Sequence, residues 1–265
     1  MPDISLQEIA QIADNSEAHD SAEEGSQSAL AWCSASHTDV GRVRHINEDA
    51  FLDSEERRLW VVADGMGGHS RGDYASSAVI RHLREFPRQT SILANLRDLE
   101  ERLQTANDQC RNAFRNKRPG TTVVLMLVHG NHCFALWAGD SRLYRWRGGE
   151  MEQLTEDHSV AQQKHAQGEL TKEESATHES AHVLTRAVGI RDTLELDLAY
   201  AQVEPGDRYL LCSDGLYNPV AQHVIATELG RGDPEDACQA LVKLALEGGG
   251  RDNITVIVAD AAHPG

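Results

Sequence analysis

The sequence lacks several features that would place it in a common class of protein. Its five cysteines lie far apart and form no C-x-x-C pair, so neither a disulfide framework nor a cysteine zinc site is supported. No segment approaches the ~18 apolar residues of a membrane span, and the N-terminus lacks the basic and apolar regions of a signal peptide. Lys and Arg number 25 against 42 Asp and Glu, and the net charge of -17 disfavours nucleic acid and anionic membranes as partners. We therefore expect a cytoplasmic protein with free thiols.

Lys, Arg, Phe, Trp and Tyr are absent from the first 29 positions, which contain seven acids. A segment with this composition has little to bury. We predict a flexible acidic tail over residues 1–29 and a single domain over residues 30–265.

Short apolar runs separated by turn residues predict antiparallel strands. Hairpins are expected at 121–138 and 142–155, and further strands at 59–63, 193–203, 208–212 and 254–259. Apolar residues recur every three or four positions over 92–114, which predicts a long helix. Shorter helices are expected at 72–86, 219–229 and 234–247, the last two with Pro at or near the first helical position. Together these elements predict an α+β fold with helices covering antiparallel sheet.

Residues 157–182 interrupt this pattern. They are polar, include four of the thirteen histidines, and carry no strand signal. We interpret them as a mobile insertion within the domain.

Acidic residues repeatedly stand at the predicted strand ends, beside Gly, Ser or Asn. Asp64 and Asp140 each follow an apolar strand, Asp214 follows another, and Asp252 precedes the last strand. Strand ends of one sheet are neighbours, so these carboxylates can converge, and converging carboxylates raise one another's pKa. A divalent cation would neutralise them, and all-oxygen ligation favours Mg²⁺ or Mn²⁺ over Zn²⁺.

Each acid taken alone has an ordinary structural explanation. Asp214 with the following Gly suits a turn, Asp252 with Asn253 suits a cap, and Asp140 could pair with Arg142. Arg44 would ordinarily form a surface salt bridge of small value. The metal interpretation therefore depends on the set and not on any single member.

Seven motifs occur in the order and spacing of a known enzyme family. They are RHINED (44–49), VVADGMGGH (61–69), GTTVV (120–124), WAGDSRLY (137–144), LTRAVG (184–189), LLCSDGL (210–216) and GGRDNITVIV (249–258). In these motifs the chain resembles the metal-dependent serine/threonine protein phosphatases of type 2C, and most of all their compact bacterial members. The resemblance covers about residues 33 to 260.

The resemblance implies a fold and a set of metal ligands. The fold is two antiparallel β-sheets forming a central sandwich flanked by pairs of antiparallel helices, in four layers (α/β/β/α). Asp64 would bridge two Mn²⁺ or Mg²⁺ ions, the Gly65 carbonyl would reach one of them, and Asp214 and Asp252 would be the other direct carboxylate ligands. Asp140 would help to hold a third, weaker ion.

Further roles follow from the same resemblance. Glu48 and Asp49 would act mainly through metal-bound waters, with Asn253 also outside the direct ligand set. Arg44 matches the phosphate-binding arginine of the family. His69 is the candidate general acid, because Met66 stands where many eukaryotic members have their catalytic histidine.

The implied activity is hydrolysis of phosphoserine and phosphothreonine on proteins. Paired cations would lower the pKa of a bridging water towards ~7, and the resulting metal-bridged hydroxide would attack phosphorus in line. The partners would be phosphorylated proteins and a cognate Ser/Thr kinase that the enzyme opposes, and we expect a monomer. Because the substrates are anionic like the chain, we expect weak binding of isolated phosphopeptides and specificity from residues 157–182.

Two alternatives stay open from the sequence. A catalytically silent, phosphatase-like regulatory or binding module would share the fold, although it should have replaced at least one metal acid. HESAH (178–182) matches the H-E-x-x-H pattern of zinc metalloproteases, but Thr185 and Val188 stand where the extended motif has Gly and His.

Other enzyme classes are excluded or disfavoured. No cysteine is followed by Arg at the sixth position, which excludes cysteine-based phosphatases, and no GK dipeptide exists, which excludes a P-loop. A two-metal nuclease would share the acids, but the net charge of -17 disfavours it.

Overall fold

A computed structural model of the chain describes residues 30–66, 71–114 and 119–263. Two five-stranded antiparallel sheets form its centre. The first has the order β1 (Ala31–Asp39), β12 (Ile254–Ala262), β11 (Arg208–Cys212), β8 (Arg142–Arg147) and β9 (Glu150–Gln153). The second has the order β10 (Asp197–Gln202), β7 (His132–Ala138), β6 (Val123–His129), β3 (Leu59–Ala63) and β2 (Ala50–Ser54). The predicted tail over residues 1–29 and the position of His69 lie outside the described residues.

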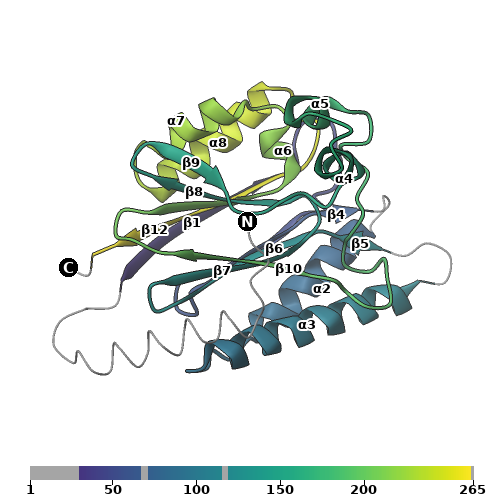
Figure 1. Cartoon of the computed structure of the whole chain (residues 1–265), viewed down its shortest axis with the longest axis horizontal. Coiled ribbons are helices and arrows are strands. Elements are labelled where there is room, and N and C mark those ends of the chain that lie inside the picture. The colour runs from purple at the N-terminus through teal and green to yellow at the C-terminus, as the bar shows by residue number, and fades with distance from the viewer. Residues whose placement is uncertain (1–29, 67–70, 115–118, 264–265) are drawn as a thin grey trace.

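Helices cover the outer face of each sheet (Figure 1). α2 (Gly72–Arg84) and α3 (Ile92–Ala113) pack on the second sheet, and α7 (Gln222–Leu229) and α8 (Pro234–Glu247) pack on the first. The four-layer α+β fold expected from the sequence is thereby confirmed. In the described ranges, no helix combines the length and the apolar character needed to cross a membrane.

Alternating side chains explain how the layers hold together. Along β6, Val123 and Leu125 face the α2–α3 side, whereas Val124 and Met126 face the space between the sheets. β12 repeats this pattern, with Ile257 between the sheets and its neighbours towards α8. Central strands buried on both faces read as continuous apolar runs. The apolar residues on both faces therefore fix the order of the layers.

Several elements differ from the sequence prediction. The strands β1 and β2 carry polar residues and were not predicted, and the helix expected from residue 219 begins only at Gln222. The strand expected over 193–203 is confined to Asp197–Gln202, although Leu194 and Leu196 pack on the core as their alternation predicted. The short helix α6 (Asp214–Tyr217) follows β11 and is four residues long.

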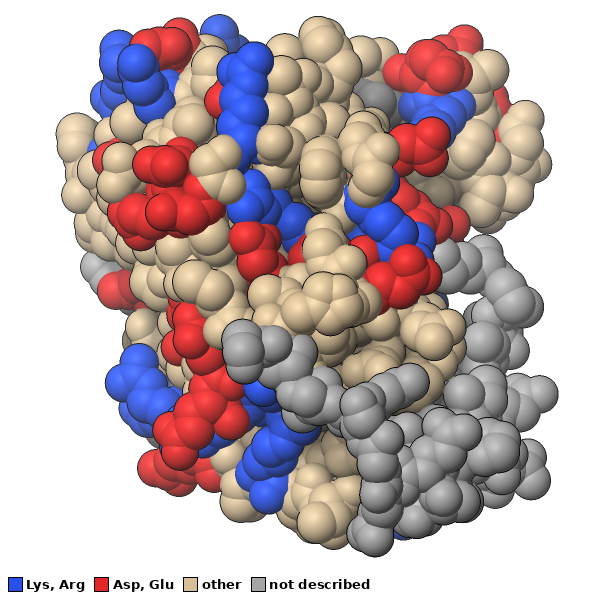
Figure 2. All heavy atoms as spheres, turned by 90° about the vertical axis from the view of Figure 1, so that its left-hand side faces the viewer, with Lys and Arg blue, Asp and Glu red and all other residues tan. Residues whose placement is uncertain are grey.

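The polar segment 157–182 contains two short helices, α4 (Val160–Ala166) and α5 (Lys172–Thr177). Both lie near α6 at one end of the sandwich, where the small sheet of β4 (Gly65–Met66) and β5 (Gly120–Thr121) also lies (Figure 1). Figure 2 shows the opposite end, where basic side chains stand among acidic ones over the part of that face that the structure describes.

Candidate active site

Four loops bring their acids to one cavity at the α4–α6 end of the sandwich. Asp64 follows β3, Asp140 follows β7, Asp214 opens α6 and Asp252 precedes β12. The cavity has a volume of about 520 Å³. All four acids line it, together with Arg44, Glu48, Gly65, Met66, Thr122, residues 182–187 and Ile190. The strand-end acids that the sequence singled out are therefore brought together.

Hydrogen bonds from its backbone to Thr122 hold Asp64 in position. Its N–H donates to Thr122 Oγ1 at 2.9 Å, and its carbonyl oxygen accepts from Thr122 N at 2.8 Å. The Thr122 hydroxyl also lies 2.7 Å from Ser141 Oγ, next to Asp140 in the chain. The same threonine thus ties the Asp64 loop to the Asp140 loop.

The backbone packing around Gly65 explains why a glycine must follow Asp64. The Gly65 N–H donates to the Glu48 carbonyl oxygen at 3.1 Å. A Cβ at this position would lie 2.3 Å from the Gly72 carbonyl oxygen and 2.4 Å from that of Glu48. Only glycine permits this approach of three backbone segments, so the Asp-Gly pair is fixed here by packing as well as by any ligand.

Asp49 lies behind the cavity as a buried carboxylate. Its Oδ2 accepts hydrogen bonds from Thr255 Oγ1 at 2.7 Å and Ser213 Oγ at 2.9 Å, whereas its Oδ1 is buried with no hydrogen-bond partner. Burial raises the pKa of Asp49 to about 7, against the lowering effect of these hydrogen bonds. An orphaned buried carboxylate oxygen requires a cation, a water or a proton.

The cavity carboxylates also resist ionisation in the absence of a cation. Burial raises the pKa of Asp140 to about 8, and the charge of Asp214 adds to the effect. Burial raises the pKa of Asp64 well above its ordinary value, with Asp49 as the next contributor. The pKa of Asp214 is raised by burial and then by Asp252. Oxygen donors in this number and charge state suit hard divalent cations, so the residues fit Mn²⁺ or Mg²⁺.

Arg44 reaches the same group of acids from the loop before β2. Its Nη2 donates to Asp252 Oδ2 at 2.7 Å, and half of the Arg44 side chain is exposed. The hydrogen bond from Arg44 to Asp252 raises the pKa of the guanidinium. Arg44 is thus a fixed positive charge at the mouth of an acidic cavity.

Glu48 and Asn253 connect this loop to the acids of the cavity. Asn253 Oδ1 accepts from Glu48 N at 2.8 Å, and Asn253 N donates to Asp252 Oδ1 at 2.9 Å. Glu48 Oε1 accepts from Gly72 N at 3.1 Å and faces the cavity. Both residues therefore orient the loops that carry Asp252 and Gly65.

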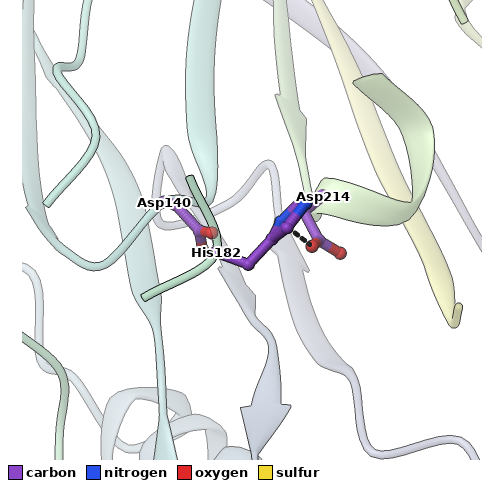
Figure 3. A group of neighbouring side chains, drawn as sticks. All are labelled: Asp140, His182 and Asp214. Atoms are coloured by element: carbon purple, nitrogen blue, oxygen red, sulfur yellow. Dashed lines mark ion pairs between the residues drawn. The ribbon is translucent and has the colours of Figure 1, made fainter. Parts of the chain in front are cut away.

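The structure adds one residue that the sequence analysis did not assign to this site. His182 lies beside Asp140 and Asp214 in Figure 3. It is the last residue of HESAH, but residues 178–182 form a turn after α5 and not a helix. The zinc-protease pattern needs both histidines on one helical face, so the structural basis for that alternative is absent.

Comparisons with known proteins agree with this geometry. The model of the family described as protein phosphatase 2C matches residues 34–242. The serine/threonine protein phosphatase PstP of Mycobacterium tuberculosis is 37% identical over 234 residues, which cover 85% of this chain and 44% of that protein. The chain therefore spans less than half the length of this relative.

Two solved structures share the fold. PppA, described as a key regulatory component of the type VI secretion system in Pseudomonas aeruginosa, superposes with a TM-score of 0.82 at 42% identity and covers 89% of this chain and 100% of its own. The catalytic domain of PstP in complex with two manganese ions gives a TM-score of 0.77 at 36% identity and covers 88% of this chain and 99% of its own.

Proposed function

The chain belongs to the protein phosphatase 2C family, and from this we propose that it hydrolyses phosphoserine and phosphothreonine on proteins in a metal-dependent reaction. The observation that carries the proposal is the convergence of Asp64, Asp140, Asp214 and Asp252 on one cavity with Arg44 at its mouth. The relative PstP is named a serine/threonine protein phosphatase, and the structure of its catalytic domain holds two manganese ions.

The cavity residues divide into cation ligands and a phosphate-binding group. Asp64, the Gly65 carbonyl, Asp214 and Asp252 would hold two Mn²⁺ or Mg²⁺ ions, and Asp140 would help to hold a third. Bound there, the cations supply charge for the phosphate oxygens and a water of lowered pKa as nucleophile. Glu48 lines the cavity and Asp49 is buried behind it, and both accept hydrogen bonds that keep the loops in place.

Arg44 supplies the charge that binds the substrate phosphate. Its guanidinium can donate two parallel hydrogen bonds to phosphate oxygens, which fixes orientation as well as position. In the structure it is paired with Asp252. A cation on Asp252 would compete for that carboxylate and leave the guanidinium donors for phosphate, so cation and substrate binding support each other.

The leaving alkoxide of serine or threonine must gain a proton. His69 remains the predicted donor, although it lies outside the described residues. Met66, which the structure does describe, lines the cavity and has no proton to give. His69 or a metal-bound water is therefore the donor that we propose.

The remaining proposals concern the setting of the enzyme. Five free cysteines, four of them buried, suit a reducing cytoplasm. Phosphorylated proteins and the kinase that modifies them are the expected partners, and we expect a monomer. Residues 182–187 line the cavity, which supports a role for the 157–182 segment and its continuation in substrate selection.

A phosphatase assay with a metal control tests the proposal. The purified chain should hydrolyse p-nitrophenyl phosphate and a phosphothreonine peptide with Mn²⁺ or Mg²⁺, and EDTA should abolish turnover. Asp214→Asn should be inactive while it remains folded. An inactive wild type that still binds phosphopeptide would favour the silent module, and metal-independent turnover would reject the mechanism.

A further inference from the structure

Exposed aliphatic side chains gather beside the cavity. Within residues 30–66, 71–114 and 119–263, the large apolar residues that are exposed are Val40, Val43, Ile46, Val183 and Ile190. Val183 and Ile190 line the cavity, and the other three belong to the loop between β1 and β2 that carries Arg44, which lines it too. Exposed apolar residues are ordinary when they are scattered singly over a surface. Their restriction to two segments that border one cavity calls for a ligand that they contact.

The loop between β1 and β2 presents Val43 on a fixed backbone. Asn253 Nδ2 donates to the carbonyl oxygens of Val40 at 2.9 Å and Ile46 at 3.0 Å, and so ties the two ends of the loop together. The Val43 residue between them is 61% exposed. A side chain on a backbone that is already ordered binds a ligand at a lower entropic cost.

The second segment is fixed in the same way and turns one residue inward and one outward. Val188 is fully buried and forms a β-bridge with Thr121, whereas Ile190, two positions further on, is 44% exposed. Ile190 Cδ1 and Met66 Cγ lie 3.1 and 3.2 Å from the position that a Cβ on Gly120 would take. Ile190 and the cavity-lining Met66 therefore form a continuous apolar wall beside the acids.

The proposed phosphate-binding role of Arg44 indicates what these residues contact. A phosphorylated serine or threonine holds its phosphate only a few bonds from the peptide backbone, so a phosphate that reaches Arg44 brings the backbone to the mouth of the cavity. In an extended peptide, the side chains two positions away point to the same face and lie about 7 Å along the strand. The neighbours of the phosphorylated residue therefore meet the exposed aliphatic residues before any more distant part of the surface.

We propose that Val43, Ile46, Val183 and Ile190 select phosphoprotein substrates with large apolar side chains within two positions of the phosphorylated residue. The inference rests on the proposed function and names the class of substrate for the same site. Apolar burial is favourable whatever the charge of the two partners, so it offsets the weak attraction between an anionic chain and an anionic substrate. About 55 Å² of apolar area removed from water corresponds to a roughly tenfold gain in binding.

Two matched phosphothreonine peptides test the selection. They differ only at the two positions on each side of the phosphothreonine, which are leucine in one peptide and serine in the other. With saturating Mn²⁺, we expect kcat/KM to be at least about tenfold higher for the leucine peptide. Phosphonate analogues of both peptides, which cannot be hydrolysed, should show the same order of affinity by fluorescence anisotropy. This second measurement reports binding separately from turnover.

Single substitutions on the two segments make the result specific. Val43→Ser and Ile190→Ser should each reduce the preference for the leucine peptide about threefold or more, mainly by raising its KM. Val43→Ile is the conservative variant and should keep the preference, because the side chain stays apolar. His223→Ala, at an exposed position of α7 that does not line the cavity, should also keep it. Far-UV circular dichroism checks that each variant is folded.

The outcomes separate this surface from the proposed function. Equal kcat/KM for the two peptides, or an unchanged preference in both serine variants, would overturn the inference. So would a dimer in analytical ultracentrifugation that Val43→Ser abolishes, because the aliphatic residues would then contact a second copy of the chain. Preferential binding of the leucine phosphonate by a protein without turnover would support the surface and reject the proposed function. Turnover without the preference would do the reverse.

Discussion

Gly139 and His158 are joined by two hydrogen bonds, next in the chain to the cavity acid Asp140. His158 N donates to the Gly139 carbonyl oxygen at 2.9 Å, and Gly139 N donates to His158 Nδ1 at 3.2 Å. Because Nδ1 accepts, the ring proton lies on Nε2, which faces Asp197 Oδ2 at 3.1 Å. Asp140 directly follows Gly139 in the chain. The imidazole therefore positions a cavity acid without touching it.

Removal of the His158 ring should weaken both the fold and the site. His158→Ala leaves the buried Gly139 N–H without an acceptor, which costs about 1–3 kcal/mol of unfolding free energy. Urea unfolding of the metal-free protein measures this loss, and turnover should fall because the Asp140 loop is released. His223→Ala, at an exposed position of α7, is the control. If both variants unfold like wild type, the positioning role is wrong.

The buried carboxylates should make the metal-free protein less stable as the pH rises. The pKa of Asp49 is raised to about 7 and that of Asp140 to about 8, so the folded state binds more protons than the unfolded state above about pH 4. Unfolding free energy then falls as pH rises from about 4 to about 8 and levels off above that. Unfolding in EDTA across this range measures the slope, which saturating Mn²⁺ should reduce.

Asp140→Asn separates this effect from general pH sensitivity. The amide cannot ionise, so the variant should be more stable than wild type at pH 8 in EDTA, by an amount of the order of one to a few kcal/mol. At pH 4 the two proteins should have similar stability. A variant that is destabilised equally at both pH values would show that Asp140 is not a repelled carboxylate in the metal-free protein.

Arg44 should contribute to substrate binding through its paired donors. Hydrogen bonds to charged groups are worth about 1.5–3 kcal/mol, so Arg44→Ala should lower kcat/KM by roughly 10- to 150-fold. Arg44→Lys should recover only part of this, since an ammonium cannot form the parallel pair. Steady-state kinetics with a phosphothreonine peptide measures kcat/KM for each variant, with Arg42→Lys as the control. Full activity in Arg44→Lys would contradict the paired hydrogen bonds and show that the phosphate needs only a positive charge at this position.

Gly65 should tolerate no side chain. Gly65→Ala places a Cβ 2.3 Å from the Gly72 carbonyl oxygen, and overpacking of this kind costs about 1–3 kcal/mol. We expect lower thermal stability and reduced Mn²⁺ affinity, because the clash displaces the adjacent Asp64. Gly148→Asn is the control, at a hairpin position with no atom within 4 Å of the added Cβ. Wild-type stability in Gly65→Ala would mean that the three backbone segments separate readily.

Local sequence pattern was sufficient for the parts of the fold that are buried on both faces. Runs such as 59–63 and 132–138 form central strands, and the acids that follow them, Asp64 and Asp140, line one cavity. The edge strand β1 was missed because its polar residues find distant partners. Ser34 Oγ, for example, donates to Asp53 Oδ1 at 2.6 Å. The hydrophobic pattern of a segment does not reveal a hydrogen-bond partner that lies far away in the sequence.

The sequence likewise predicted the site residues that lie in local motifs, but not the contacts between distant segments. The motifs carry Arg44 and the four acids, but they say nothing of His182, whose place depends on the turn after α5. Nor could they predict that His158 bonds Gly139, because these residues are 19 positions apart. Their contact follows from the way the segment after β9 returns across the end of the sandwich.

Anomalous diffraction from crystals grown with Mn²⁺ would test the central claim most directly. The account predicts manganese peaks inside the cavity, in contact with the carboxylates of Asp64, Asp214 and Asp252, and the same peaks absent from Asp64→Asn crystals. A cavity without anomalous density at saturating Mn²⁺, or manganese bound only elsewhere on the surface, would contradict it.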